Sequence, residues 1–378
     1  PRQLRKKWHQ TRAPQDKTIL NNTNQNLSRE IYKFKNKNLN KYLSELTYDN
    51  KTDYSLWKAT KQLKRPISQV SAIKKSNGNW AKSEKERADA FAEYLATVFS
   101  TGANNMQELE EINNTDQDEI PYFTITEVKK EIKYLKSKKS PGFDLIVSSL
   151  LKYLPHKAVS KLATIFNAVI RFKYFPNMWK VAEIIMILKP GKNPNEASSY
   201  RPISLLPIIG KLFEKLFSKK LKNIITNKQI IPNHQFGFRE KHSTIEQIHR
   251  TTHQIEIALE KREICSAVFL DVSKAFEDVW HKGLIHKLNL LLPKHYCQIL
   301  ESYLSDRLFR VKLDNEFSEL RPIQSGVPQG SILGPLLYLL YTYDIPVNEN
   351  CLVGTFADDT VIMSIDRNIE SSTQNLQT

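Results

Sequence analysis

The sequence predicts an α+β fold, in which amphipathic helices alternate with short strand hairpins. Apolar residues recur at helical spacing over 159–170 and 212–221, which marks the buried faces of two helices. Residues 181–188 are a continuous apolar run with one charge, which is typical of a buried strand. A turn at 189–192 leads to a second extended segment at 200–206, so these two runs predict a hairpin.

Further helix starts and a further hairpin follow from local patterns. A Ser or Thr followed three residues later by Glu forms a capping box, which satisfies the first free N–H groups of a helix. Residues 309–313 and 317–323 flank Asp314-Asn315 and predict another hairpin. The three capping boxes are Ser83 with Glu86, Thr124 with Glu127, and Ser243 with Glu246.

Positive charge is concentrated near the N-terminus. The 378 residues include 56 Lys or Arg and 40 Asp or Glu, a net charge of +16, and residues 1–65 hold 16 of the basic and 5 of the acidic residues. Such an excess favours a polyanionic partner, with nucleic acid first and an anionic membrane surface second. The candidate phosphate contacts are Arg5, Lys6 and Lys7, together with Lys138 and Lys139 in a basic loop; the same residues also fit a solvated helix face and an ordinary loop.

The first 120 residues form a segment distinct from the rest. Apolar residues between 27 and 46 recur at helical spacing, which predicts one long amphipathic helix or two. Residues 100–120 are acidic, rich in Asn and poor in large apolar side chains, as expected of a linker. We therefore predict a basic, mostly helical segment with a linker over 1–120, followed by a second domain over 121–378.

Cysteine usage and hydropathy exclude several classes of protein. Cys265, Cys297 and Cys351 are far apart and show no CxxC spacing, so neither a zinc site nor a disulfide framework is indicated. A reducing, intracellular compartment fits this pattern. No apolar run is long enough to span a bilayer and no signal peptide is visible, so no membrane partner is expected. The chain begins at Pro1 and stops at Thr378, which suggests a fragment.

Three carboxylates carry the candidate chemistry. Asp358 and Asp359 lie in a turn between the apolar runs 351–355 and 360–365, and Asp271 ends the strand-like run 265–270. Mg²⁺ prefers one or two carboxylates together with substrate phosphate oxygens. Three carboxylates on two adjacent strands could hold two Mg²⁺ ions roughly 4 Å apart. The alternative is a pair of plain turns, since Asp is a favoured turn residue.

Two further loops could contact a nucleotide. Lys189 and Lys192 tip the first hairpin and Arg201 follows it, so these cations could fold over a triphosphate; a solvated surface hairpin is the alternative. The loop 325–331 is rich in Gly and Pro, with Gln329 as its polar anchor, and it precedes an apolar helix. Such a loop permits close backbone approach to a substrate, and it also fits a plain helix-entry turn.

In their order along the chain, the motifs resemble those of one family, the reverse transcriptases of non-LTR (LINE-type) retrotransposons, near the jockey-like elements. Residues 1–99 also resemble the family's segment between endonuclease and polymerase, including SLWK at 55–58. Glu277 departs from the family, which usually has Asp there. The resembling motifs are SPGFD (140–144), KPGK (189–192), YRPISL (200–205), QFGFR (235–239), FLDVSKAF (269–276), SGVPQGSILGP (325–335) and FADD (356–359).

The resemblance implies a right-hand polymerase, with fingers and palm in 121–378 and the thumb missing. Asp271, Asp358 and Asp359 would be the catalytic metal ligands, holding two Mg²⁺ ions, with Mn²⁺ as a substitute. Phe276 would stack under the sugar and exclude a 2′-hydroxyl, which selects deoxynucleotides and disfavours an RNA-making polymerase. Arg201 would grip the triphosphate with help from Lys189 or Lys192, and Gln329 and Gly330 would line the nucleotide pocket.

The implied activity is RNA-directed DNA synthesis, with target-primed reverse transcription as the family's process. The implied partners are an RNA template, a DNA primer or target DNA, and dNTPs. The protein would act in the nucleus at integration and bind element RNA in the cytoplasm. The alternative is a truncated, inactive remnant that only binds nucleic acid.

Overall fold

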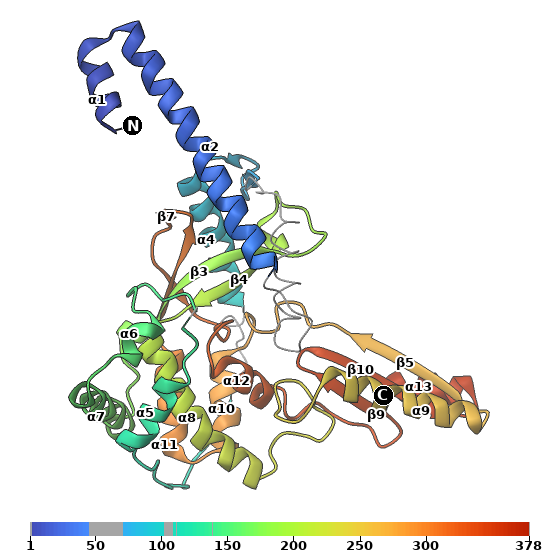
Figure 1. Cartoon of the computed structure of the whole chain (residues 1–378). Helices are drawn as coiled ribbons and strands as arrows, with labels where there is room; N and C mark the ends of the chain where they lie inside the picture. The colour runs from blue at the N-terminus through green and yellow to red at the C-terminus, as the bar shows by residue number, and fades with distance from the viewer. Residues whose placement is uncertain (1, 45–70, 102–108, 111, 138, 378) are drawn as a thin grey trace. The chain divides into compact units, whose positions relative to one another are not determined.

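The chain divides into two compact units, Pro1–Val70 and Ser71–Thr378. The computed structural model describes residues 2–44, 71–101, 109–110, 112–137 and 139–377 (Figure 1). Lys138 and the SLWK motif at 55–58 lie outside the described residues.

The described part of the first unit consists of two helices, α1 (Arg2–Thr11) and α2 (Pro14–Ser44). This agrees with the helical spacing seen in the sequence. Apolar side chains on α2 such as Ile31 and Phe34 are exposed, so this helix buries little of its apolar surface within its own unit. The domain boundary expected at residue 120 stays a prediction, although the helix α4 (Glu84–Thr101) already packs within the second unit.

A mixed sheet of five strands forms one part of the second unit. Its central strand β3 (Val181–Leu188) pairs antiparallel with β4 (Tyr200–Leu205) and parallel with β6 (Arg307–Leu313). The β6 strand also pairs with β7 (Glu316–Phe317) and β8 (Arg321–Ile323). Both predicted hairpins are therefore confirmed. The pairing between β3 and β6 is additional, and joins segments more than a hundred residues apart.

Helix α4 covers this sheet. Its residues Phe91, Leu95 and Phe99 are buried together with Ile184 of β3 and Phe309 of β6. Phe99 meets Phe309 edge to face, with ring centroids 5.2 Å apart. The small hairpin of β1 (Ile73–Lys74) and β2 (Trp80–Ala81) precedes α4 and contributes Ile73 and Ala81 to the same cluster.

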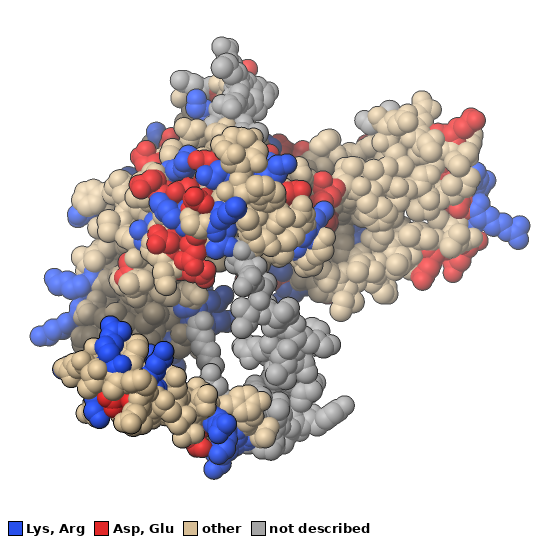
Figure 2. All heavy atoms as spheres, turned by 90° about the horizontal axis from the view of Figure 1, so that it is seen from above, with Lys and Arg blue, Asp and Glu red and all other residues tan. Residues whose placement is uncertain are grey.

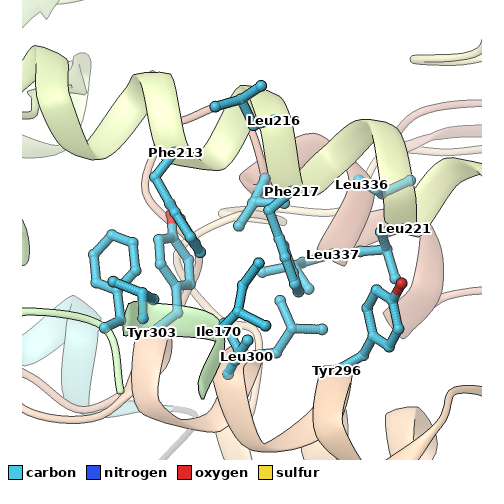
Figure 3. Close-up of a cluster of buried hydrophobic side chains, with 14 of the residues drawn as sticks. Ile170, Phe213, Leu216, Phe217, Leu221, Tyr296, Leu300, Tyr303, Leu336 and Leu337 are labelled. Carbon is cyan, nitrogen blue, oxygen red and sulfur yellow. The ribbon is translucent and has the colours of Figure 1, made fainter. Parts of the chain in front are cut away.

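The larger core is helical and is centred on α8 (Ile208–Asn227). Figure 3 shows Phe213 and Phe217 of α8 pointing toward Leu300 and Tyr303 of α11 (Lys294–Leu304). Burying one such aromatic side chain contributes about 1.5–3 kcal/mol. Further helices of this unit are α5 (Ile125–Lys133), α6 (Ser148–Lys152), α7 (His156–Phe172), α10 (His281–Leu291) and α12 (Gly334–Tyr341), and short 3₁₀ turns lie at Asn177–Trp179 and Ala197–Ser199.

A separate antiparallel sheet has the order β5 (Ile264–Leu270), β10 (Asp359–Asp366), β9 (Leu352–Phe356). Helices α9 (Thr244–Glu260) and α13 (Ile369–Gln377) pack against it (Figure 1). The strand β5 is an edge, and apolar residues along it are exposed. In Figure 2 the lobe on the right, which carries this sheet, shows few charged side chains except near its tip.

The α+β class predicted from the sequence is confirmed by these helices and mixed sheets. All three capping boxes are present, with reciprocal hydrogen bonds at Thr124, Ser243 and Ser83. None of the helices in the described ranges is long and apolar enough to cross a membrane. The assignment of fingers and palm stays a prediction.

Candidate active site

The two acidic motifs meet at one end of the three-stranded sheet. Asp359 pairs with Phe356 across the β9–β10 hairpin, so Ala357 and Asp358 form its two-residue turn. Leu270 is opposite Thr360, so Asp271 and Asp359 are the next residues along the same two neighbouring strands. Asp358 is half-buried, whereas Asp271 and Asp359 are exposed. The fold thus brings Asp271 next to a pair of carboxylates that begins 87 residues further along the sequence.

As their side chains stand, these carboxylates do not form a closed metal cage. Among the residues that the structure describes, no group of three or more His, Cys, Asp or Glu is arranged to hold one ion. The donor set is nevertheless suited to a hard cation, because all its atoms are carboxylate oxygens from adjacent strand ends. Mg²⁺ commonly takes only one or two carboxylates and completes its shell with water and substrate phosphates.

A segment from the QFGFR motif runs along the base of the turn. The backbone N–H of Thr355 donates to the His234 carbonyl, and the N–H of Phe236 donates to the Thr355 carbonyl, both at 2.9 Å. This pairing attaches residues 234–236 to the end of β9 like a short parallel strand. The sequence identified the motif only by resemblance and did not predict its contact with the acidic turn.

Phe276 lies in an aromatic group beside that turn. Its ring stacks on Tyr338 of α12, with centroids 5.0 Å apart and planes 15° apart, and meets Phe238 edge-on at 5.8 Å. Burial raises the pKa of Tyr338 to about 12, with a further contribution from the charge of Asp358. The sequence indicated Tyr338 only as part of an apolar helix, whereas in the structure it stacks on Phe276 and is close enough to Asp358 to feel its charge.

The loop at 325–331 joins the segment after β5 to strand β4. The Gln329 side-chain amide donates to the Glu277 carboxylate at 3.0 Å, and the Gln329 carbonyl accepts from the N–H of Ser204 at 2.7 Å. Burial raises the pKa of Glu277, and the charge of Lys189 opposes that shift. Glu277, which departs from the family pattern, therefore anchors the residue expected to line the nucleotide pocket.

Two glycines allow this loop to pack closely. Gly326 has φ +86°, and a Cβ there would lie 2.5 Å from the Glu277 carbonyl oxygen. Gly330 has φ +112°, and its Cβ would lie 2.7 Å from the Ser204 carbonyl oxygen. In the structure the loop therefore packs closely on the chain's own Glu277 and strand β4, and the approach of its backbone to a substrate stays a prediction.

The expected triphosphate contacts lie at the tip of the β3–β4 hairpin. Arg201 is exposed on β4 opposite Ile187. Lys189 is half-buried, and its ammonium donates to the Ser198 carbonyl at 3.3 Å, while Lys192 is exposed in the turn. The charge of Lys189 acts on Glu277, which in turn accepts a hydrogen bond from Gln329. The tip of the hairpin and the Gln329 loop are therefore close enough to interact electrostatically.

The expected phosphate contacts elsewhere are exposed where they are described. In the first unit, Arg5, Lys6 and Lys7 project from α1, and Lys7 forms an ion pair with Asp16 at 3.1 Å. In the second unit, Lys139 is exposed, and its charge helps to lower the pKa of Lys211, for which burial is the larger cause.

The sequence did not predict a cleft of about 1010 Å³ beside α8. It extends from α5 to Phe238 and Arg239 and carries several lysines, some of them neutralised by carboxylates. Of the lining lysines, Lys219 forms an ion pair with the buried Glu131, and Lys222 forms one with Glu240. The cleft is therefore less positive than its lysine content suggests.

Comparisons with known proteins agree with this geometry. Residues 187–377 match the family described as reverse transcriptase (RNA-dependent DNA polymerase). The chain is 40% identical to the probable RNA-directed DNA polymerase from transposon BS of Drosophila melanogaster, over 96% of this chain and 42% of that protein. It is 39% identical to the probable RNA-directed DNA polymerase from transposon X-element of the same fly, over 96% of this chain and 41% of that protein.

A third relative is the RNA-directed DNA polymerase from mobile element jockey of Drosophila melanogaster, which is 37% identical over 100% of this chain and 43% of that protein. The chain thus spans about two fifths of the length of each of these three relatives. The matched stretch 187–377 contains Asp271, Asp358 and Asp359 as well as the Gln329 loop. The resemblance to non-LTR retrotransposon polymerases is confirmed, and the chain belongs to the reverse transcriptase family.

Proposed function

We propose that this chain carries the polymerase centre of a non-LTR retrotransposon reverse transcriptase and joins dNTPs to a primer 3′-hydroxyl. The observation that carries the proposal is the meeting of Asp271, Asp358 and Asp359 at one end of a sheet, within a stretch that matches the family. In this reaction the 3′-hydroxyl oxygen attacks the α-phosphorus in line, the bond to the β-phosphate oxygen breaks, and pyrophosphate leaves.

The three carboxylates would hold divalent metal ions together with the phosphate oxygens of the nucleotide. Such ions lower the pKa of the attacking hydroxyl and neutralise charge on the leaving group. Reverse transcriptase domains in general use divalent ions, with Mg²⁺ expected here and Mn²⁺ as a substitute. Asp271 and Asp359 keep their relative positions because they are the chain neighbours of the paired residues Leu270 and Thr360 of two hydrogen-bonded strands.

The other site residues bind and orient the substrate. Arg201 offers a planar fork to the phosphates, and Lys189 and Lys192 add mobile positive charge. Gln329 and Gly330 present the loop to the nucleotide and template, and Phe276 lies under the sugar. An RNA template and a DNA primer or target DNA complete the substrates, and Arg5, Lys6, Lys7, Lys138 and Lys139 are proposed as phosphate contacts. Action in the nucleus at integration, after binding of element RNA in the cytoplasm, follows from the same proposal.

Primer extension on an RNA template tests the assignment. We expect Asp358→Asn to abolish DNA synthesis while RNA binding is kept, because the substitution removes an ionic ligand without adding bulk or negative charge. Asp366→Asn is the matched control, since Asp366 lies at the opposite end of β10, beside Ile264, and should leave synthesis unchanged.

Two results would contradict the proposal. Synthesis by Asp358→Asn at the level of the unchanged chain would remove the catalytic role. An unchanged chain that binds RNA but makes no DNA with Mg²⁺ or Mn²⁺ would favour the second candidate, an inactive remnant that only binds nucleic acid.

A further inference from the structure

We propose that Gln235 is a positioning residue that sets the conformation of the acidic turn and so aims the Asp358 carboxylate. The Gln235 side chain is buried. It forms hydrogen bonds with both backbone polar groups of Ala357, the residue directly before Asp358. Its Oε1 accepts from the N–H of Ala357 at 3.0 Å, and its Nε2 donates to the carbonyl of Ala357 at 3.2 Å. The inference rests on the proposed function, because it concerns the same site.

The turn needs such support because of its backbone geometry. Ala357 has φ +61°, in the left-handed region that residues with a Cβ seldom adopt. It occupies the first central position of a two-residue hairpin turn, where Gly is the usual residue when only that position has positive φ. The hydrogen bonds from Gln235 offset this cost and hold one conformation where an unsupported turn would sample several.

Only a primary amide of this length satisfies both groups of Ala357. Glu at position 235 would offer acceptors but no donor for the Ala357 carbonyl, and Asn would be one methylene too short. The Oε1 atom also accepts from the N–H of Gly237 at 2.7 Å, which fixes the amide orientation from its own segment. The Gln235 amide therefore makes hydrogen bonds both to its own segment, at Gly237, and to the acidic turn, at Ala357.

Gly237 gives a second, independent sign of this close contact. A Cβ at position 237 would lie 2.1 Å from the backbone nitrogen of Ala357 and 2.7 Å from its Cα. No side chain larger than hydrogen fits while the segments keep this separation. The close packing of their segment on the acidic turn thus explains why position 235 is Gln and position 237 is Gly.

The experiment compares two buried glutamines next to the same sheet. Gln235→Leu removes the grip on the turn, whereas Gln247→Leu alters a buried glutamine whose side-chain polar atoms have no hydrogen-bond partner in the described structure. Misplacing a reacting group by about 1 Å can cost roughly 100-fold in rate. We expect Gln235→Leu to lower the rate of primer extension by ten- to 100-fold with little change in the dNTP KM, and Gln247→Leu to change neither.

Two further readouts separate positioning from general support of the fold. Amide hydrogen exchange at Ala357 should become at least tenfold faster in Gln235→Leu but not in Gln247→Leu. Ala357→Gly, which removes the cost of positive φ, should recover part of the rate lost in Gln235→Leu. A merely structural role for Gln235 would not produce that recovery.

The proposal is overturned if Gln235→Leu slows extension no more than Gln247→Leu, if exchange at Ala357 is unchanged, or if Ala357→Gly restores nothing. Hydrogen exchange needs no catalysis, so it decides the positioning role even in a chain without polymerase activity. If the chain makes no DNA but Gln235→Leu still speeds exchange at Ala357, the proposed function is wrong and the positioning role of Gln235 stands.

Discussion

Strands β3 and β5 have similar apolar sequences but different environments. β3 lies between two strands and under α4, and its residues Ala182 and Ile184 are fully buried. β5 has a neighbour along one edge only, and its Phe269 is 77% exposed. An apolar strand pattern therefore predicts that a segment joins a sheet. The position of the strand in that sheet decides how much of its side-chain surface is buried. The covered sheet carries Arg201 on β4, and the sheet with the exposed edge strand ends at the three candidate catalytic carboxylates.

The largest expected effect is on stability and comes from one phenylalanine in each sheet. Phe309→Ala in β6 should lower the free energy of unfolding by about 3–5 kcal/mol, because it leaves a cavity beside Phe99. Phe269→Ala in β5 should change it by no more than about 0.5 kcal/mol, because that ring packs on little. Urea unfolding followed by circular dichroism measures both.

A loss of more than about 1.5 kcal/mol for Phe269→Ala would break this comparison, since only a buried side chain carries such a cost. It would mean that β5 is covered in solution. The comparison would also fail if Phe309→Ala lowered the free energy of unfolding by no more than Phe269→Ala does.

A smaller effect concerns Phe276, which follows β5 and stacks on the helical core. Phe276→Ala should admit ribonucleotides, with a loss of sugar discrimination on the order of 100-fold or less, the scale that a single apolar group supplies. The ratio of kcat/KM for dNTP and NTP in primer extension measures it. Phe238→Ala is the control, because Phe238 touches the same ring edge-on and should leave the ratio unchanged. An unchanged ratio in Phe276→Ala would remove the role as a sugar gate.

The smallest effect is a pH dependence from the helical core. Glu214 is fully buried on α8 and accepts hydrogen bonds from the N–H groups of Ile332 at 2.7 Å and Leu333 at 3.1 Å. Burial raises its pKa above the ordinary 4.5, and these hydrogen bonds only partly oppose the shift. Because ionisation is harder in the folded chain than in the unfolded one, Glu214 supports stability below about pH 4.5 and loses that contribution as pH rises through the folded pKa.

Glu214→Gln keeps an acceptor for both N–H groups and does not ionise. Its free energy of unfolding relative to the unchanged chain should therefore rise between pH 4 and pH 7, as measured by urea unfolding at each pH. A constant difference across that range would show that the carboxyl does not titrate as its burial requires.

Much of the scaffold could be predicted from the sequence because its signals are local. The strand 181–188 and the capping boxes at Thr124 and Ser243 depend on neighbouring residues only. The acidic residues were likewise found from strand ends and turn chemistry. The contact of Gln235 with Ala357 could not be found this way, since 122 residues separate them and the motifs that contain them do not indicate which residues touch. The openness of β5 was also beyond reach, because it depends on what packs nearby.

The contact between Gln235 and Ala357 also bears on the order of folding. The β9–β10 hairpin closes through neighbours in sequence and can form on a microsecond scale. The segment that holds its turn must arrive from 122 residues away, which requires most of the chain between them to be collapsed first. We expect the acidic turn to reach its native conformation late, after its own hairpin has formed. Catalytic activity would then require the whole chain to be folded, and formation of the strands alone would not be enough.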